Sequence, residues 1–210
     1  MANRTSGSLA VVVPPQIEPV DLEKIRGHLR IDIGEENSEL AGYISAARVM
    51  VEEQTWRALL TQTLQYRLDA WPQGREILLP RPPLQSVSSV TLHLADGSSE
   101  VWDDAAYLVD PVAEPGRLVL GPGESWPRGT LRPAAGIVIE YVAGWPGVDA
   151  VPMPIRQAIQ LMVGDWYENR ENTLIERGAN VASLPLSMKW LLIPYTLHDN
   201  RFLEQEQGLR

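Results

Sequence analysis

The sequence predicts an α+β protein, in which a small helical bundle (residues about 21–60 and 152–196) carries an inserted antiparallel β-sandwich or barrel-like module. Two observations predict this class. Apolar residues recur with the 3.6-residue period of a helix near both ends of the chain, whereas residues 63–149 follow the two-residue period of strands between Gly- and Pro-rich turns. The expected organisation is a helical core of residues 21–62 plus 150–197 around a β insert of residues 63–149.

An extended N-terminal arm of residues 1–20 is expected before the helical core. It opens with small polar residues, and Pro14, Pro15 and Pro19 favour an extended backbone in its second half. The apolar stretch Leu9–Val13 has two interpretations that the sequence leaves open. It is either a strand donated to a neighbouring sheet edge or a frayed terminus.

Two helices are predicted after the arm. Asp21 is a suitable N-cap for a short helix that ends near Leu29. A second helix is expected from about Ser38 to Arg57, and its small residues Gly42 and Ala46 indicate that another helix packs closely against it. The apolar stripe of this second helix consists of Leu40, Ile44, Ala47 and Val51.

The β insert follows from alternating apolar and polar residues. An Asp96-Gly97 pair predicts a hairpin turn, and residues 121–133 form a Gly- and Pro-rich loop. Short strands at such spacing are typical of a compact antiparallel sandwich or barrel. The expected strands are residues 63–70, 77–79, 90–94, 99–102, 107–109, 117–120 and 137–142.

A third helix is predicted from Pro154 to Glu171. Pro154 suits the first helical position, because the first N–H groups of a helix have no partner within it. Gly164 weakens the helix interior, which indicates close approach of another backbone. We expect this helix to pack on the helix of residues 38–57. The expected helix-packing core consists of Ile44, Ala47, Val51, Ile155, Ile159 and Met162.

A short helix is expected at Ser187–Leu197, followed by a C-terminal tail of residues 198–210. The tail is mostly polar, so the sequence predicts that it is disordered in the free subunit and becomes ordered against a partner. Phe202 and Leu203 are the expected anchors, and Arg201 is placed to pair with a carboxylate. The alternative is an unused frayed end.

Composition excludes several classes of protein. The 210 residues carry a formal charge of −9, which argues against a protein that grips nucleic-acid phosphates. There are no cysteines, so neither a disulfide framework nor a thiolate metal site is possible. No apolar run approaches the roughly 18 residues of a membrane span, and no signal-peptide core is present, so we expect synthesis in the cytosol.

Searching for reactive groups reveals no active site. The histidines at positions 28, 93 and 198 lack a second ligand at metal-site spacing, and no phosphate-binding Gly-rich loop is present. The adjacent carboxylate pairs at 35–36, 52–53 and 103–104 are expected to be solvated. The seven tryptophans are scattered along the chain with no local cluster, so they are expected in cores or interfaces. The sequence thus predicts no catalysis, no cofactor and no metal.

Seven short strings, taken in order, resemble one known family. They are His28-Leu29-Arg30, Ala46-Ala47-Arg48 leading to Glu52, Trp56–Thr63, Leu79–Val87, Tyr141–Gly144, Tyr167–Arg170 and Leu191–Tyr195. Their order and spacing resemble the head–tail connector (adaptor, or head-completion) proteins of tailed bacteriophages, in the subgroup with a β insert in the helical core. The family often has Arg after the final Pro-Tyr, where Thr196 stands here.

The resemblance implies a ring of identical subunits, with twelve as the expected number, that docks on the portal protein and extends the DNA channel toward the tail. It implies a tail-side neck or stopper protein as a second partner, passage of DNA without specific binding, location in the virion neck, and no catalysis. The residues expected to contact the portal or a neighbouring subunit are Trp166, Tyr167, Arg170, Trp190, Leu191, Tyr195, Arg201, Phe202 and Leu203. The alternative function is a β-sandwich module that binds sugar or a host surface, with the helices as its mount.

Overall fold

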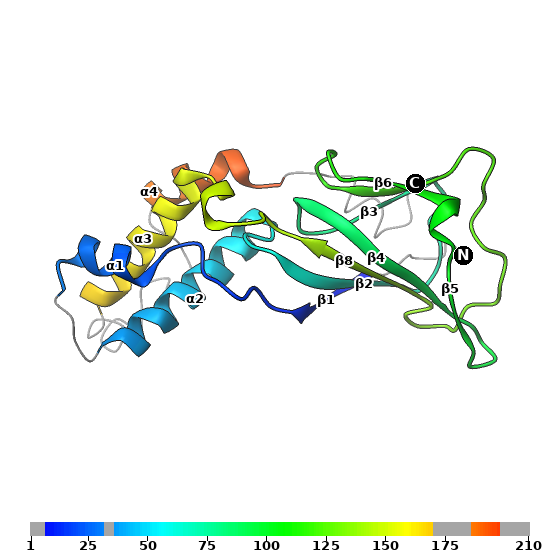
Figure 1. Cartoon of the computed structure of the whole chain (residues 1–210), viewed down its shortest axis with the longest axis horizontal. Coiled ribbons are helices and arrows are strands. Elements are labelled where there is room, and N and C mark those ends of the chain that lie inside the picture. Colours follow the sequence, from blue (N-terminus) through cyan, green and yellow to red (C-terminus); the bar gives the residue numbers. More distant parts are fainter. Residues whose placement is uncertain (1–6, 32–35, 170–185, 198–210) are drawn as a thin grey trace. The chain divides into compact units, whose positions relative to one another are not determined.

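The computed structural model describes residues 7–31, 36–169 and 186–197, with the side chains of the last range from residue 188 onward. The chain divides into two compact units (Figure 1). Of the described residues, the β unit comprises 7–16 and 61–145, and the helical unit comprises 17–31, 36–60, 146–169 and 186–197. Four α-helices and two antiparallel sheets in the described residues confirm the predicted α+β class.

The helical unit is built on two long helices, α2 (Asn37–Thr55) and α3 (Met153–Glu168), which pack on each other. Two shorter helices, α1 (Leu22–Leu29) and α4 (Leu186–Leu192), pack against α3. Asp21 caps α1 as predicted, because its Oδ1 accepts the backbone N–H of Glu23 at 2.9 Å. Single 3₁₀ turns, η2 (Val148–Ala150) and η4 (Ile193–Tyr195), precede α3 and follow α4.

The core of this unit lies along the facing stripes of α2 and α3. Each of the following side chains has an exposed fraction of 2% or less: Ile44, Ala47, Val51, Ile155, Ile159 and Met162. The expected role of the glycines is wrong. A Cβ at Gly164 would lie 3.5 Å from Leu29 Cδ2, which is ordinary contact with a side chain of α1, and a Cβ at Gly42 would meet nothing within 4 Å. Neither glycine therefore mediates close approach of α2 to α3.

The β unit contains one five-stranded and one three-stranded sheet, both antiparallel. The strand order of the first is β1-β2-β8-β4-β5, and that of the second is β3-β7-β6. Neither order closes on itself, so among the described strands there is no barrel. The strands are β1 (Gly7–Val13), β2 (Gln62–Leu68), β3 (Glu76–Leu78), β4 (Leu84–His93), β5 (Ser99–Val101), β6 (Tyr107–Asp110), β7 (Arg117–Leu120) and β8 (Ile137–Ala143).

Strand β4 begins at Leu84, six positions before the predicted start at residue 90. Its pairing with β8 shifts register between Leu84 and Ser86 and again between Val87 and Ser89. Each irregularity adds a residue on one strand, so side chains no longer alternate strictly between faces. The polar string in this part of the sequence is therefore strand, although its pattern does not have a two-residue period.

Large apolar and aromatic side chains on β2, β4 and β8 form the core of the β unit. Tyr66 faces Ile139 across the β2–β8 ladder, and both are buried. The phenol of Tyr141, also buried, donates to the Pro80 carbonyl at 2.7 Å, beyond the end of β3. A Cβ at Gly116, which precedes β7, would overlap with Leu84 of β4. The contact of Tyr141 with Pro80 and that of Gly116 with Leu84 join the two sheets into one unit.

The expected N-terminal arm contains a strand of the protein's own sheet. Strand β1 pairs antiparallel with β2, from Gly7 opposite Leu68 to Val13 opposite Thr63 (Figure 1). Of the two interpretations of Leu9–Val13, the frayed terminus is excluded. The strand pairs here with an edge in the same chain.

Candidate functional site

Candidate reactive groups are sparse in residues 7–31, 36–169 and 186–197. In those ranges no group of three or more His, Asp or Glu side chains is placed to hold a metal ion. The imidazole Nδ1 of His93 lies 2.7 Å from the Ser99 hydroxyl, across the β4–β5 hairpin. None of the helices described is long and apolar enough to cross a membrane. The features with functional potential are a buried ionic network, the attachment of the C-terminal segment, and exposed aromatic surfaces.

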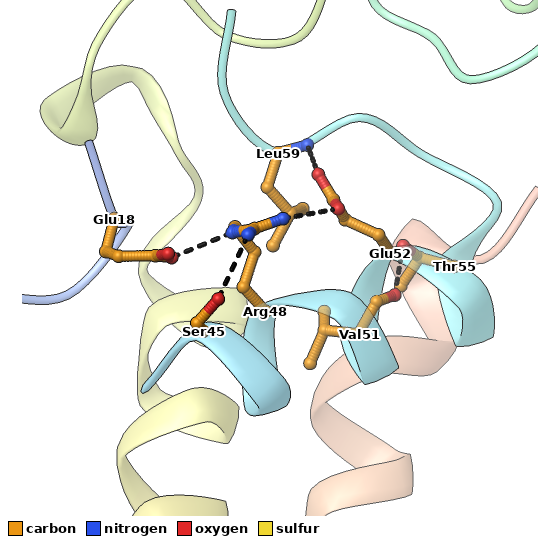
Figure 2. A network of polar contacts seen from close by, with 7 residues as sticks. All are labelled: Glu18, Ser45, Arg48, Val51, Glu52, Thr55 and Leu59. Atoms are coloured by element: carbon orange, nitrogen blue, oxygen red, sulfur yellow. Dashed lines mark hydrogen bonds and ion pairs between the residues drawn. The ribbon is translucent and has the colours of Figure 1, made fainter. Parts of the chain in front are cut away.

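The buried ionic network centres on Arg48 of α2 (Figure 2). Its Nε lies 2.8 Å from a carboxylate oxygen of Glu18, and its Nη1 lies 3.0 Å from Glu52, one turn along the helix. Its Nη2 also donates to the Ser45 hydroxyl at 3.3 Å. The second carboxylate oxygen of Glu52 accepts the backbone N–H of Leu59 at 2.9 Å. One guanidinium thus connects α2 with the chain segments that precede α1 and follow α2.

Burial makes this network sensitive to substitution. The side chains of Arg48 and Glu52 are only 10% and 11% exposed, against 32% for Glu18. A buried charge without its partner is strongly destabilising, because no water replaces the lost contact. The expectation that the carboxylates at 52 and 53 are both solvated is therefore wrong for Glu52, while Glu53 is exposed. The spacing of Arg48 and Glu52, four residues apart beside the apolar stripe, was the available signal.

The segment that leads to the C-terminal tail is attached to the end of α2. Arg57 Nε donates to the Tyr195 carbonyl at 2.6 Å, and the backbone N–H of Leu197 donates to the Thr55 carbonyl at 3.0 Å. Arg57 is buried, and Trp56 before it ends the helix in the left-handed conformation, with φ 57°. The position from which residue 198 continues is therefore fixed by backbone contacts of the helical unit.

Three large apolar residues of the helical unit are exposed and are here together called the C-terminal apolar surface: Trp56, Trp190 and Ile193. Their exposed fractions are 53%, 66% and 49%. Trp190 and Ile193 lie three positions apart on α4 and η4, and Trp56 adjoins the two residues, Thr55 and Arg57, that bind the segment after η4. Large exposed aromatic residues are enriched in protein–protein interfaces. Trp190 was among the residues expected to contact the portal or a neighbouring subunit, whereas Trp56 was covered only by the general expectation that tryptophans lie in cores or interfaces.

The other residues expected to contact the portal or a neighbouring subunit differ in how exposed they are and in whether they already have partners. Leu191 and Tyr195 are half-buried. The ring of Trp166 meets Tyr43 edge-on at 6.2 Å, and the Tyr167 phenol donates to Glu36 at 2.6 Å, so both already have partners within the helical unit. The remaining expected residues, Arg170, Arg201, Phe202 and Leu203, lie outside the described residues.

Three of the tryptophans, which form no local cluster in the sequence, come together in the fold. In the β unit the ring of Trp71 stacks on Trp126, with centroids 4.7 Å apart and planes at 11°, and Trp102 lies 5.3 Å and 5.7 Å from them. Tyr107 lies 5.0 Å from Trp102. Burial, followed by the charges of the carboxylates at 104 and 103, raises the pKa of the Tyr107 phenol. Only the folded topology brings these rings together, since they are separated by up to 55 positions in sequence.

The aromatic cluster holds the Gly- and Pro-rich loop in place. The indole N–H of Trp126 donates to the Gly74 carbonyl at 2.8 Å, so this loop residue is attached to the chain before β3. Sugar-binding modules use a ring face that is open to stack against the ligand. Here the half-buried rings stack and pack on each other, which favours a structural role for the cluster over a sugar-binding platform.

Comparison with known proteins gives matches among solved structures alone. No protein-family model and no curated protein matches the chain. A chain from the neck of an empty gene transfer agent (GTA) particle, computed with C6 symmetry, matches with a TM-score of 0.74 at 22% identity. A chain from the virion of the native GTA particle matches with a TM-score of 0.73 at 23% identity. A chain from the neck of the native GTA particle, computed with C12 symmetry, matches with a TM-score of 0.69 at 24% identity.

Each of these matches covers 91% of this chain and 96% of the other chain. The shared fold therefore includes both the helical unit and the β unit. The structural neighbours are chains from the neck and the virion of the gene transfer agent particle.

Proposed function

We propose that this protein is a structural adaptor in the neck of a tailed-phage-like particle. In this role it forms a ring that docks on the portal protein and extends the DNA channel toward a tail-side neck or stopper protein. The observation that carries the proposal is the match of nearly the whole chain to chains of GTA neck structures. Such a protein is made in the host bacterial cytoplasm and resides in the virion neck.

A ring of twelve copies is the oligomer that fits best. One of the matched neck structures was computed with C12 symmetry and another with C6, which divides twelve. In a cyclic ring each subunit presents two different surfaces, one to each neighbour. The −9 charge of each subunit suits a conduit, because a negative wall does not retain passing phosphates.

For the portal contact we propose the C-terminal apolar surface together with the C-terminal tail. Trp190 is 66% exposed and lies five positions before Tyr195, whose carbonyl accepts a hydrogen bond from Arg57. After the segment that contains Tyr195, the tail supplies Arg201, Phe202 and Leu203. An exposed tryptophan and a short apolar anchor are side chains of the kind expected at the centre of an interface.

Reconstitution with the portal protein of the same particle tests this function. The two purified proteins are mixed and imaged by electron microscopy, and we expect an added ring of twelve-fold symmetry on the portal. Trp190→Ala should abolish the added ring, because truncation removes the interface anchor. Val112→Ala, at an 88% exposed position of the β unit, is the matched control and should leave it intact. Wild-type protein that never binds the portal would contradict the proposal.

DNA binding gives an independent test. An adaptor that lets DNA pass should show no appreciable affinity for random duplex at physiological salt, measured by fluorescence anisotropy. Tight binding that weakens steeply with added salt would instead indicate a protein that grips phosphates.

A further inference from the structure

Strand β1 is attached to the β unit almost entirely through its backbone. It lies at one end of the described strand order and pairs with β2 alone among those strands. None of its residues is buried, and its last three valines, at positions 11, 12 and 13, are 57%, 46% and 45% exposed. A ladder of backbone hydrogen bonds forms equally well with any strand of the same sequence. The strand is therefore held by contacts that another copy of this chain could supply.

The edge formed by β1 carries none of the usual protection against pairing. Exposed edge strands in soluble proteins are commonly guarded by charged residues or by proline. Gly7–Val13 contains neither, and the register shift between Val11 and Val13 is the one irregularity in its pairing with β2. In an assembly this edge would have to be covered by the adjacent subunit, because pairing of β1 with the β2 of another copy leaves its outer side as open as before.

The segment that follows β1 is built as a hinge with one fixed end. Pro14 and Pro15 come directly after the strand and restrict the backbone to extended conformations. Glu18, four residues after Pro14, is held by Arg48 at 2.8 Å. The segment from Pro14 to Glu18 spans at most roughly 17 Å when fully extended. The hinge thus lets β1 leave its own sheet, while the contact of Glu18 with Arg48 limits how far the strand can move.

We propose that in the assembled ring β1 of each subunit pairs with β2 of the adjacent subunit, in the register seen within one chain. The inference rests on the ring proposed above. Exchange of a terminal strand uses contacts that are already complementary within one chain. Each subunit gives one strand and receives one, as the symmetry of a cyclic ring requires. Gly7 fixes the register, because a Cβ there would overlap with the Tyr66 hydroxyl of the receiving β2.

Disulfide trapping tests the exchange directly, because the chain has no cysteine of its own. Ala10 lies opposite Gln65 in the β1–β2 ladder. Directly opposed residues of antiparallel strands have Cα atoms about 4.5–5.5 Å apart, which suits a disulfide. The variant with Ala10→Cys and Gln65→Cys is assembled into rings, checked by electron microscopy, oxidised with copper phenanthroline and run on a denaturing gel.

Covalently linked oligomers up to the full ring are the expected result, while the dilute free subunit should give an internally linked monomer. A 1:1 mixture of the two single-cysteine variants should also yield a linked dimer after assembly. The control, Thr91→Cys with Val138→Cys across β4 and β8, should remain an internally linked monomer in both states. A second pair, Ser8→Cys with Arg67→Cys, repeats the test two positions along the same ladder.

Two failures are distinguishable. In the first, rings form normally but contain only internally linked monomers, or the control pair is oxidised while no β1–β2 disulfide forms. Either result would overturn strand exchange without contradicting the ring itself. Wild-type protein that forms no ring overturns the proposed function, and strand exchange with it.

Discussion

Arg48 and Glu52 lie one turn apart on α2 and form a buried ion pair at 3.0 Å, and the same Glu52 accepts the backbone N–H of Leu59. This relationship joins helix, ion pair and loop in a single unit. It also explains why two charged residues lie against the apolar stripe of α2, because each has its charge compensated within the fold.

Replacing Arg48 with Met should lower the free energy of unfolding by about 3–5 kcal/mol, because the buried ion pair with Glu52 and the ion pair with Glu18 are lost together. Adding Glu52→Gln should recover much of the loss, since the amide oxygen can still accept the Leu59 N–H. Urea unfolding of both single variants and the double variant gives the coupling energy. The matched control is Arg117→Met, whose partners Glu76 and Asp110 are half-exposed, and its effect should be clearly smaller. Equal losses for Arg48→Met and Arg117→Met would contradict the buried network.

Gly164→Ala should stabilise the protein by about 0.5–1 kcal/mol, because alanine has the higher helix propensity. The new Cβ would meet Leu29 at 3.5 Å, which is ordinary contact. Gly42→Ala, with nothing within 4 Å, should give a similar gain. Gly7→Ala should instead destabilise, because its Cβ overlaps with the Tyr66 hydroxyl. Thermal melts of the three variants check this order, and a loss of stability for Gly164→Ala would mean that α1 packs more tightly on α3 than the structure shows.

Ile159→Asp should cost about 3–5 kcal/mol, because it removes a fully buried side chain and introduces a charge without a partner. Met153, in the first turn of the same helix, is 63% exposed. Met153→Asp should therefore change the free energy of unfolding by about 0.5 kcal/mol or less. Calorimetry of the two variants decides the matter. If Ile159→Asp melts within a degree or two of the parent, the stripe of α3 is not buried.

Helices and most strands could be predicted because their cause is local. The stripe that contains Ile155 and Ile159 has the 3.6-residue period, and Asp21 has the chemistry of an N-cap. The start of β4 could not be read from the sequence, because its two register shifts break the alternation on which the prediction depends. A sequence pattern therefore predicts regular elements and misses the irregularities within them.

The candidate site was less accessible to sequence reasoning. The contact of Trp71 with Trp126 depends on the path of the intervening chain, which no local pattern encodes. Glu52 was expected in solvent because adjacent carboxylates on one helix rarely point together, but its burial is compensated by Arg48 and Leu59. Long-range compensation of this kind becomes visible only when the fold is known.

The pH dependence of stability should report on Tyr141. Burial, and secondarily the neighbouring Tyr66, raises the pKa of the Tyr141 phenol well above its ordinary value. Below about pH 10 the phenol is protonated in both the folded and unfolded states. Above that pH the unfolded chain loses its proton first, so the free energy of unfolding falls as pH rises toward the higher folded pKa.

Tyr141→Phe should therefore lose about 1 kcal/mol at pH 7, through the missing hydrogen bond to Pro80, yet show a shallower fall between about pH 9 and 11. Part of the decrease in the free energy of unfolding should remain in this variant, because the pKa of Tyr107 is also raised. Urea unfolding at several pH values measures both slopes. Parallel curves for the wild type and Tyr141→Phe would show that this phenol does not control alkaline stability.

Deleting residues 200–210 should separate stability from assembly. The tail offers only Phe202, Leu203 and Leu209 as apolar residues, so its removal should shift the melting temperature by no more than a degree or two. The contact of Arg57 with Tyr195 and that of Thr55 with Leu197 lie before the deletion and remain intact. Addition of the ring to the portal should nevertheless weaken greatly, because the proposed anchors are lost.

A double substitution, Phe202→Ser with Leu203→Ser, tests whether apolar anchoring is the reason. It keeps the length and charge of the tail, so it should reproduce most of the assembly defect of the deletion if the two side chains fill a pocket on the portal. Arg201→Gln should have a smaller effect, since an ion pair at the rim of an interface contributes little. If the deletion variant still adds a ring to the portal at the normal yield, the tail is not an anchor. The C-terminal apolar surface around Trp190 must then provide the docking contact by itself.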